Sequence, residues 1–328
     1  MTIITRRTAL TGAAAITTAA LAPLGRGTAH AATPPAGKQA PAFYRAKVGD
    51  FEVTQLADGA RTFPMPDTFV RNVPKAQALA AAEAAYMPKG MVTIPFNPTL
   101  INTGSKLVLI DTGNGPGGGP AVGHLIPNLA AAGVDPKQID IVVLSHLHPD
   151  HTNGIRAKDG SLAFPNAEIK VPRHDWAFWQ SDDNAAKAAD NPMMKNYFAN
   201  VRKTFAGLEK KVTMYDWDKE VAPGVTAFDT SGHTPGHSSF VVASGSSKLL
   251  VQVDVTNIPE LFLRHPEWHL MFDVDPVKAV ATRRRLYDMA AAEKTLIAGY
   301  HFSFPSMGHV EKDGNDYRLV PVRWNPVL

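Results

Sequence analysis

The chain has 328 residues, with 33 basic and 30 acidic side chains and no cysteine, and 45% of its residues are hydrophobic. The lack of cysteine excludes disulfides, thiolate metal sites and a cysteine nucleophile. Three arginines and no acidic residue lie in the first 31 positions, so the formal charge of +3 falls to zero without them. A neutral remainder gives no electrostatic reason to expect a nucleic-acid partner.

Residues 1–31 have the plan of an export signal. Arg6 and Arg7 precede a long run rich in alanine, threonine and leucine, and the tripeptide AHA at 29–31 is a small-x-small cleavage pattern. The paired arginines favour the twin-arginine export route. We therefore expect a periplasmic or secreted protein.

The layout expected after the signal has two parts. A linker rich in proline, alanine and glycine occupies 32–41, and a single hydrolase domain occupies 42–328. This part of the chain contains no apolar stretch of about 18 residues, so no membrane span is expected. Its length suffices to bury a large core.

Strand and helix patterns alternate along the domain. Strands are predicted at 51–59, 139–145 and 295–302, and hairpins at 99–113 and 224–257. Helices are predicted at 75–87, 121–133, 173–209 with a break near Asn191-Pro192, and 277–293. The proline-rich stretch 60–75 and the glycine-rich stretch 114–120 are expected to be loops. Strands mixed with helices favour an α/β architecture.

The two predicted hairpins resemble each other in sequence. LINTGSKLVLIDTG and FVVASGSSKLLVQVDV align with one inserted residue, which places Asp111 opposite Asp254. The similarity predicts two related halves, each a mixed sheet with covering helices. Two unrelated hairpins are the alternative.

The hexapeptide HLHPDH at 146–151 directly follows a buried strand. His146 and His148 stand two apart in an extended segment and therefore point the same way, while Asp150 and His151 can reach a neighbouring point. One catalytic metal takes about three protein ligands. Four ligands packed this tightly favour two metals, about 3.5–4 Å apart.

A two-metal site needs further ligands, and three later segments offer them. His233 lies among small turn residues in GHTPGH, and His301 follows the apolar run LIAGY. Asp254 ends the apolar run LLVQVD, where a carboxylate is costly unless it is bound. A lone histidine at a strand end is usually a polar residue that faces water, but together the seven positions predict a metal centre. Imidazole and carboxylate ligands favour zinc, with manganese, iron or cobalt as alternatives.

These motifs resemble the metallo-β-lactamase superfamily, and within it the methyl parathion hydrolases and related lactonases and esterases. The segments APAFYRAKVGDFEVTQLADG, INTGSKLVLIDTG, GHTPGH, FPSMGH and YRLVPV carry the resemblance, which spans Pro41 to Val322. It implies a four-layer αββα sandwich with two mixed sheets and a site at the top of both. It also implies a homodimer.

The resemblance further implies how the ligands divide. His146, His148 and His233 go to one metal, Asp150, His151 and His301 go to the second, and Asp254 bridges both. Two such ions lower the pKa of a bridging water, and the resulting hydroxide attacks an acyl carbon or phosphorus centre. Asp150 and Asp254 are thus the expected catalytic side chains.

The expected substrates are small hydrophobic lactones, carboxylic esters or organophosphate triesters. A β-lactamase is an alternative, which Asp254 and the lack of cysteine disfavour, and a non-catalytic metal-binding protein on the same scaffold is another. Aromatic and apolar side chains are expected to line the pocket: Phe63, Met65, Phe69, Phe178, Trp179, Tyr197 and Phe198. The stretch NGPGGGP lacks the aromatic residue that methyl parathion hydrolases carry here, which predicts a roomier entrance suited to lactones or esters.

Overall fold

The computed structural model describes residues 35–37 and 39–328. The predicted signal at 1–31 and part of the predicted linker lie outside the described residues. Residues Pro41–Leu328 form one unit, which the following paragraphs describe. Within the described residues, no helix combines the length and the apolarity that a bilayer crossing needs.

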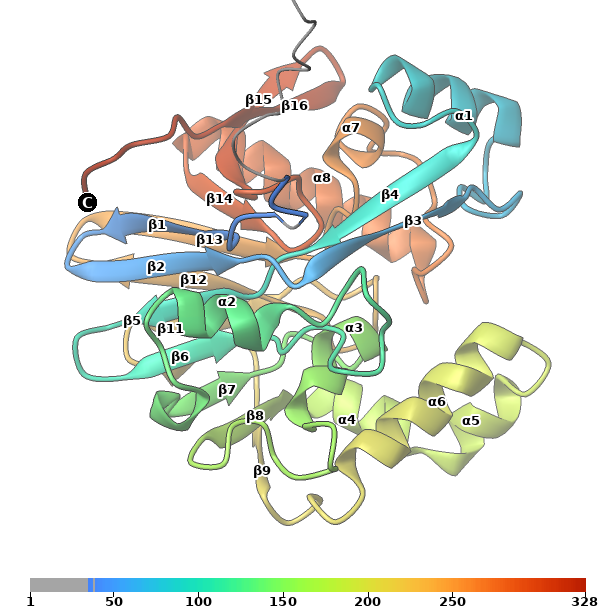
Figure 1. Ribbon diagram of the computed structural model, residues 1–328. Coiled ribbons are helices and arrows are strands. Elements are labelled where there is room, and N and C mark those ends of the chain that lie inside the picture. Colours follow the sequence, from blue (N-terminus) through green and yellow to red (C-terminus); the bar gives the residue numbers. More distant parts are fainter. Residues whose placement is uncertain (1–34, 38) are drawn as a thin grey trace, which may run out of the picture. The chain divides into compact units, whose positions relative to one another are not determined.

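Two seven-stranded sheets and a two-stranded arm make up the strands of the described chain (Figure 1). The first sheet has the order β1 (Phe43–Val48), β2 (Phe51–Leu56), β5 (Thr99–Asn102), β6 (Leu107–Ile110), β7 (Ile141–Val143), β8 (Glu168–Pro172) and β9 (Val212–Tyr215). The second has the order β10 (Lys219–Ala222), β11 (Val225–Asp229), β12 (Ser238–Ser244), β13 (Ser247–Val253), β14 (Leu296–Gly299), β15 (Met307–Asp313) and β16 (Asp316–Pro321).

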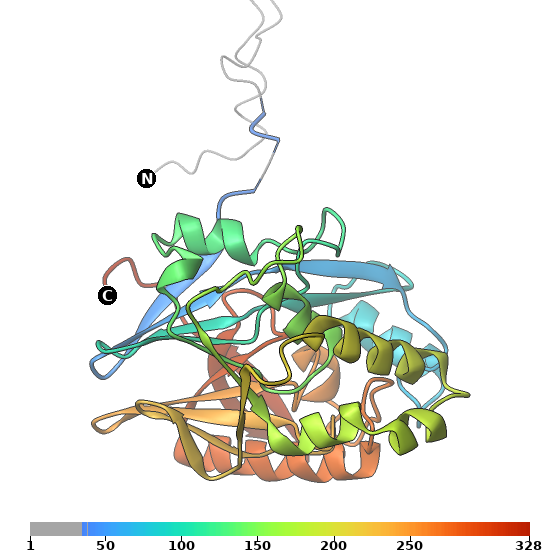
Figure 2. The ribbon, with the colours of Figure 1, turned by 90° about the horizontal axis from the view of Figure 1, so that it is seen from below.

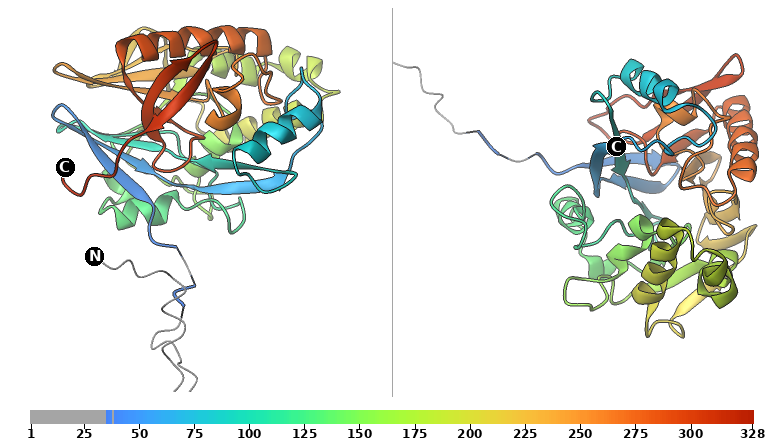
Figure 3. Two further views of the ribbon diagram at one scale, coloured as in Figure 1. Left: turned by 90° about the horizontal axis from the view of Figure 1, so that it is seen from above. Right: turned by 90° about the vertical axis from the view of Figure 1, so that its right-hand side faces the viewer.

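Helices cover the outer faces of both sheets. The helices are α1 (Lys75–Ala84), α2 (Leu125–Ala131), α3 (Pro149–Thr152), α4 (Arg173–Gln180), α5 (Asp182–Lys187), α6 (Pro192–Phe205), α7 (Pro259–Phe262) and α8 (Pro276–Glu293). Figures 2 and 3 show α2 and α8 on opposite outer sides with the sheets between them. The predicted four-layer αββα sandwich with two mixed sheets is confirmed.

Alternating side chains hold the layers together, because successive residues of a strand point to opposite faces. In β6, Val108 and Ile110 belong to the core between the sheets, whereas Leu109 packs outward with Leu125 and Leu129 of α2. The second sheet repeats the pattern, and its outward side chains pack against Leu286, Tyr287 and Ala290 of α8. A hydrophobic core therefore fills each of the three interlayer spaces.

The strand directions repeat between the two sheets. In the first sheet, neighbouring strands in the series β1-β2-β5-β6 are antiparallel, and β6 is parallel to β7. In the second sheet, neighbouring strands in the series β10-β11-β12-β13 are likewise antiparallel, and β13 is parallel to β14. Asp111 comes directly after β6 and Asp254 directly after β13. This correspondence agrees with two related halves.

The prediction of a loop over 60–75 is wrong in its first part. Residues Gly59–Pro64 form β3, which pairs antiparallel with β4 (Met91–Phe96) as an arm that runs toward α1 (Figure 1). Pro64 lies at the end of its strand and Pro95 lies in a two-stranded pair with a free edge. Proline is tolerated at such positions because no ladder hydrogen bond is required there.

Arg283 of α8 is a buried cation that ties several loops together. Its side chain is 1% exposed and donates hydrogen bonds to the backbone carbonyls of Val255, Pro266 and Trp268, at 3.0, 2.9 and 3.0 Å. The Asp273 carboxylate lies 3.6 Å from its guanidinium group. Burial lowers the pKa of Arg283, and these acceptors stabilise its charged form.

We expect Arg283→Met to lower the free energy of unfolding by about 3–5 kcal/mol, because it leaves three buried backbone carbonyls without their hydrogen bonds and removes the cation beside the Asp273 carboxylate. The matched control is Arg284→Met. Arg284 is next in sequence, but its side chain is 38% exposed and its ion pair with Glu267 spans 3.6 Å, so a loss below about 1 kcal/mol is expected. Urea denaturation of both variants measures the difference, and equal losses would contradict the assigned role of Arg283.

Candidate metal centre

The seven predicted ligands converge at the edge where several strands end. Their positions are as follows: His146, His148, Asp150 and His151 on the segment after β7, His233 after β11, Asp254 directly after β13, and His301 two residues after β14. Three overlapping groups form, and within each group one ligand atom per residue lies within 4.8 Å of the others. They are His146/His148/His233, His146/His151/Asp254 and Asp150/His151/His301.

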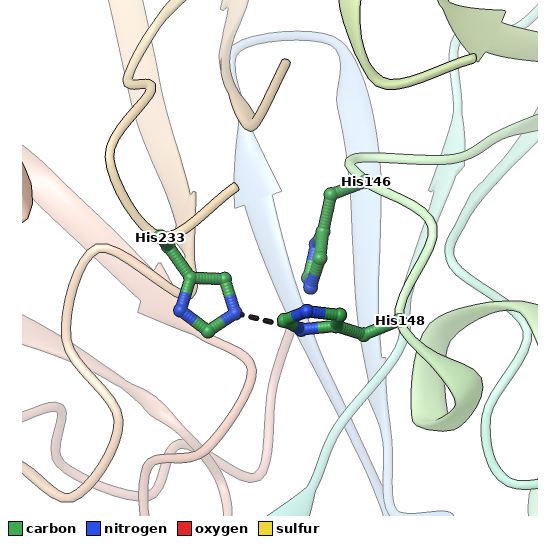
Figure 4. Close-up of side chains that lie close together, drawn as sticks. All are labelled: His146, His148 and His233. Atoms are coloured by element: carbon green, nitrogen blue, oxygen red, sulfur yellow. Dashed lines mark hydrogen bonds between the residues drawn. The ribbon is translucent and has the colours of Figure 1, made fainter. Parts of the chain in front are cut away.

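The first group consists of three histidines whose rings point toward one another (Figure 4). His233 Nε2 lies 3.0 Å from His148 Nδ1. Burial lowers the pKa of both His146 and His148 well below the ordinary value, so both imidazoles are neutral. A neutral imidazole offers a nitrogen lone pair to a metal ion.

Asp254 lies between His233 of the first group and His301 of the third. Its Oδ2 lies 3.3 Å from His233 Nε2 and 2.9 Å from His301 Nε2, and its Oδ1 lies 3.4 Å from His151 Nε2. Burial favours the neutral carboxyl, but His301 and His151 outweigh burial and hold the pKa of Asp254 well below its usual value. The two oxygens of this carboxylate therefore face histidines from three different segments.

Asp150 belongs to the third group and lies at the rim of the site. Its Oδ2 lies 3.5 Å from His151 Nε2 and 3.6 Å from His301 Nε2. Its side chain is 25% exposed, whereas the two histidines are almost fully buried. Asp150 therefore faces both the centre and the space above it.

Unpartnered atoms at the centre show that these residues fit cations. His146 Nε2, His151 Nε2 and Asp254 Oδ1 are buried and have no hydrogen-bond partner among the described residues. Such orphaned polar atoms cost about 1–3 kcal/mol each and are rare in folded proteins. Two divalent cations would satisfy these atoms, and the donor set of imidazoles and carboxylates suits zinc.

Four of the candidate ligand histidines also form a hydrogen bond through ring nitrogen Nδ1. The pairs are His146 Nδ1 with Ser145 Oγ at 3.0 Å, His151 Nδ1 with Asp111 Oδ2 at 2.8 Å, His233 Nδ1 with Asp273 Oδ1 at 2.8 Å, and His301 Nδ1 with the carbonyl oxygen of Pro95 at 2.7 Å. Such partners fix the orientation of a ring and raise its basicity. Each partner leaves Nε2 of its histidine directed to the centre.

Asp111 and Asp273 were not predicted from the sequence as part of the site. Asp111 also accepts hydrogen bonds from the backbone N–H and the hydroxyl of Ser145, at 2.8 and 2.7 Å. The run LVLID carries the same signal that identified Asp254, a carboxylate at the end of a buried strand. Asp273 lies in an irregular segment, where no comparable sequence signal exists.

Asp175 is a third missed residue, and it joins two of the ligand-bearing loops. Its carboxylate accepts hydrogen bonds from the backbone N–H of Leu147 at 2.9 Å and of Gly236 at 2.6 Å. A Cβ atom at Gly236 would lie 2.1 Å from the backbone nitrogen of Asp175, so only glycine permits this approach. Trp179 Nε1 donates to the same carboxylate at 3.1 Å.

His237 supports the centre from outside it. Its Nε2 accepts a hydrogen bond from the backbone N–H of Asp254 at 3.1 Å. Burial lowers the pKa of His237 to about 3, so the ring stays neutral and can accept. This contact holds the backbone from which the bridging carboxylate projects.

A cavity of about 770 Å³ opens above the centre. Of the seven predicted pocket residues, Phe63 and Tyr197 line it. The other five do not: Met65 and Phe69 lie in the core between the sheets, and Phe178, Trp179 and Phe198 pack in the core beneath α4 and α6. The apolar lining residues that the sequence did not predict are Pro66, Ile94, Phe96, Ala121, Pro149, Met271 and Phe272.

The sequence is similar to a known family and to named relatives. The family model described as the metallo-beta-lactamase superfamily matches residues 95–301. The N-acyl homoserine lactonase AiiA of Bacillus thuringiensis subsp. kurstaki is 26% identical over 239 residues, covering 66% of this chain and 85% of that protein. The N-acyl homoserine lactonase AttM of Agrobacterium fabrum is 30% identical over 202 residues, covering 56% and 70%.

Two solved structures share the fold over most of the chain. The hydrolase AbOPH of the beta lactamase superfamily has a TM-score of 0.81 and 31% identity, covering 88% of this chain and all of that one. AidC, a dizinc quorum-quenching lactonase, has a TM-score of 0.81 and 25% identity, covering 87% and 99%.

We expect Asp273→Asn to weaken zinc binding by about 10–100-fold, because His233 loses the carboxylate that orients and polarises its ring. The matched control is Asp275→Asn, since Asp275 caps the start of α8 by accepting from the backbone N–H of Lys278 and does not contact a ligand histidine. Competition with a chromogenic chelator measures both affinities. An unchanged affinity in Asp273→Asn would show that this partner is dispensable.

Proposed function

The chain belongs to the metallo-beta-lactamase superfamily, and on that premise we propose that it is a two-metal hydrolase that cleaves lactones and carboxylic esters. The observation that carries the proposal is the cluster of unpartnered ligand atoms at the base of a largely apolar cavity. The cluster would hold one cation on His146, His148 and His233 and a second on Asp150, His151 and His301, with Asp254 shared. Bound cations of this kind polarise a substrate carbonyl and acidify a water molecule.

The chain's own side chains orient the substrate above the cations. Tyr197 lines the cavity, and its hydroxyl has no hydrogen-bond partner among the described residues. Burial raises the pKa of Tyr197, so the phenol remains protonated at neutral pH and can donate to a substrate oxygen. Asn257 is 2% exposed, lines the same cavity, and its Oδ1 is unpartnered within the described chain.

Lactones and esters suit the cavity better than the other substrates of the superfamily. Its volume of about 770 Å³ lies within the usual range for small-molecule sites. Phe63, Ile94, Phe96 and Phe272 supply apolar surface for an acyl chain or an aromatic alcohol. Relatives named as N-acyl homoserine lactonases add support for a cyclic ester.

We expect zinc-loaded protein to hydrolyse hexanoyl-homoserine lactone, dihydrocoumarin and phenyl acetate faster than methyl parathion or paraoxon, and not to turn over nitrocefin. His148→Ala should lower activity by more than about 100-fold, since the loss of even an outer partner of a ligand costs 10–100-fold. His309→Ala is the control, because His309 is exposed and, among the described residues, its side chain is hydrogen-bonded only to the carbonyl of Lys294. Nitrocefin turnover without lactone or ester hydrolysis would overturn the proposal.

Export is a separate proposal that rests on the sequence. The Arg6-Arg7 pair, the apolar run and the AHA tripeptide at 29–31 support a cleaved signal at 1–31, followed by a linker and a single domain. The lack of cysteine means that the exported chain folds without disulfides.

We expect the full-length chain, expressed in a bacterium with a twin-arginine system, to accumulate in the periplasm with a new N-terminus at Ala32. Arg6→Lys with Arg7→Lys should retain the uncleaved precursor in the cytoplasm, because the pathway depends on the arginine pair. Mass spectrometry of the fractions measures both results. An intact N-terminus in the periplasm would contradict cleavage after residue 31.

A further inference from the structure

A second cavity, of about 760 Å³, adjoins the cavity above the metal centre. The two cavities share four lining residues: Arg61, Asn114, Gly118 and Asn153. We call the second cavity the basic annex and define it by the cationic residues that line it, which are Arg61, Arg156, Lys158 and Lys203. The shared lining places the two cavities side by side, with Arg61 between them.

The electrostatic character of the annex differs from that of the metal centre. Four cationic side chains line it, and the described residues that line it include no carboxylate. The metal-centre cavity, by contrast, is lined by Asp150 and Asp254. A concave surface with charges of one sign concentrates ligands of the opposite sign.

Three of these cations remain available for a ligand. The guanidinium of Arg156 is committed to the backbone carbonyls of Thr204, Gly160 and Ala206, at 3.0, 3.1 and 2.7 Å. The side chains of Arg61, Lys158 and Lys203 make no hydrogen bond or ion pair with any residue that the structure describes. Arg61 is therefore an unpaired arginine at the junction of the two cavities.

The glycine-rich stretch after β6 leaves room for this junction. A Cβ atom at Gly118 would lie 3.1 Å from Nη2 of Arg61 and 2.3 Å from Cγ2 of Val122. A larger residue at Gly118 would therefore displace the side chain of Val122 or of Arg61. Gly117 also lines the annex, but a Cβ atom there would meet nothing within 4 Å.

We propose that the basic annex binds a carboxylate at the far end of the substrate, while the ester or lactone bond of that substrate lies at the metal centre. The proposal rests on the proposed function and narrows it to esters and lactones whose acyl chain ends in a carboxylate. Arg61 supplies the main contact, because the guanidinium group matches a carboxylate with two parallel hydrogen bonds. Lys158 and Lys203 add charge from the open side.

Matched phenyl esters test the proposal. The monophenyl esters of succinic, adipic and suberic acid are compared with phenyl butyrate, hexanoate and octanoate, which have the same chain lengths without the terminal carboxylate. For at least one chain length, we expect the kcat/KM of the zinc-loaded wild type to be higher for the carboxylate ester than for the neutral ester by about 10-fold or more, because the KM is lower. The preference should shrink at high ionic strength, because salt screens exposed charges.

Two variants test whether the preference for the carboxylate esters arises in the annex. Arg61→Gln should reduce the ratio of the two kcat/KM values by about 10–100-fold, as expected for the loss of a charge-assisted hydrogen bond. Gly117→Tyr should reduce it as well, because the new side chain fills the annex. Lys195→Gln is the control, since Lys195 is exposed on the same helix as Lys203 and lines neither cavity.

The outcomes separate this inference from the proposed function. If the wild type hydrolyses the neutral esters without preferring the carboxylate esters, or if both annex variants keep the preference, the inference is wrong and the proposed function stands. If no ester or lactone is hydrolysed, the proposed function is wrong. The inference is then decided by calorimetry, which compares the binding of adipate and of hexanoate to the wild type and to Arg61→Gln. Equal binding of adipate to the two proteins overturns the inference.

Discussion

The burial of Asp254 is the constraint on which much of the structure depends. This carboxylate ends the central strand β13 and is 4% exposed, so it requires compensating groups within the protein. Isolated buried charges are very unfavourable, whereas charges that meet opposite partners or metal ions are tolerated. His151, His233 and His301 come from three other segments to surround it. The sandwich brings their strand ends to one edge and thereby makes this placement possible.

The backbone at the end of β13 contributes to the same placement. Val253 has a φ of 54°, which is rare for a β-branched residue, and the pairing with β14 shifts register between Val251 and Val253. Such a conformation costs about 1–3 kcal/mol and persists only where the surroundings impose it. The surroundings here include the hydrogen bond from the Asp254 backbone N–H to His237 Nε2. Asp111, at the corresponding end of β6, has a φ of 64°.

Sequence patterns located the ligands better than the groups around them. The candidate ligands lie in a dense motif or within four residues of a strand end, so short-range sequence information suffices. Asp273 reaches His233 only through the fold, and no nearby sequence pattern marks it.

The aromatic pocket residues were harder to predict, because the presence of many aromatic residues does not say which side of a helix faces a cavity. Trp179 illustrates this: its ring lies 5.7 Å from that of His148, yet it is fully buried and donates to Asp175.

The arm formed by β3 and β4 explains why part of the apolar lining, Ile94 and Phe96, was not predicted. The prolines of the segment from 60 to 75 favoured a loop, but pairing with β4 produces a strand that places Arg61 and Phe63 along the cavity. The partner strand supplies Ile94 and Phe96, and the carbonyl of Pro95 holds His301. This arm thus carries part of the cavity wall, an unpaired cation and a support for His301. Because Pro95, whose carbonyl holds His301, and part of the cavity wall lie on the same arm, a change in the arm that alters substrate fit will also act on the position of His301.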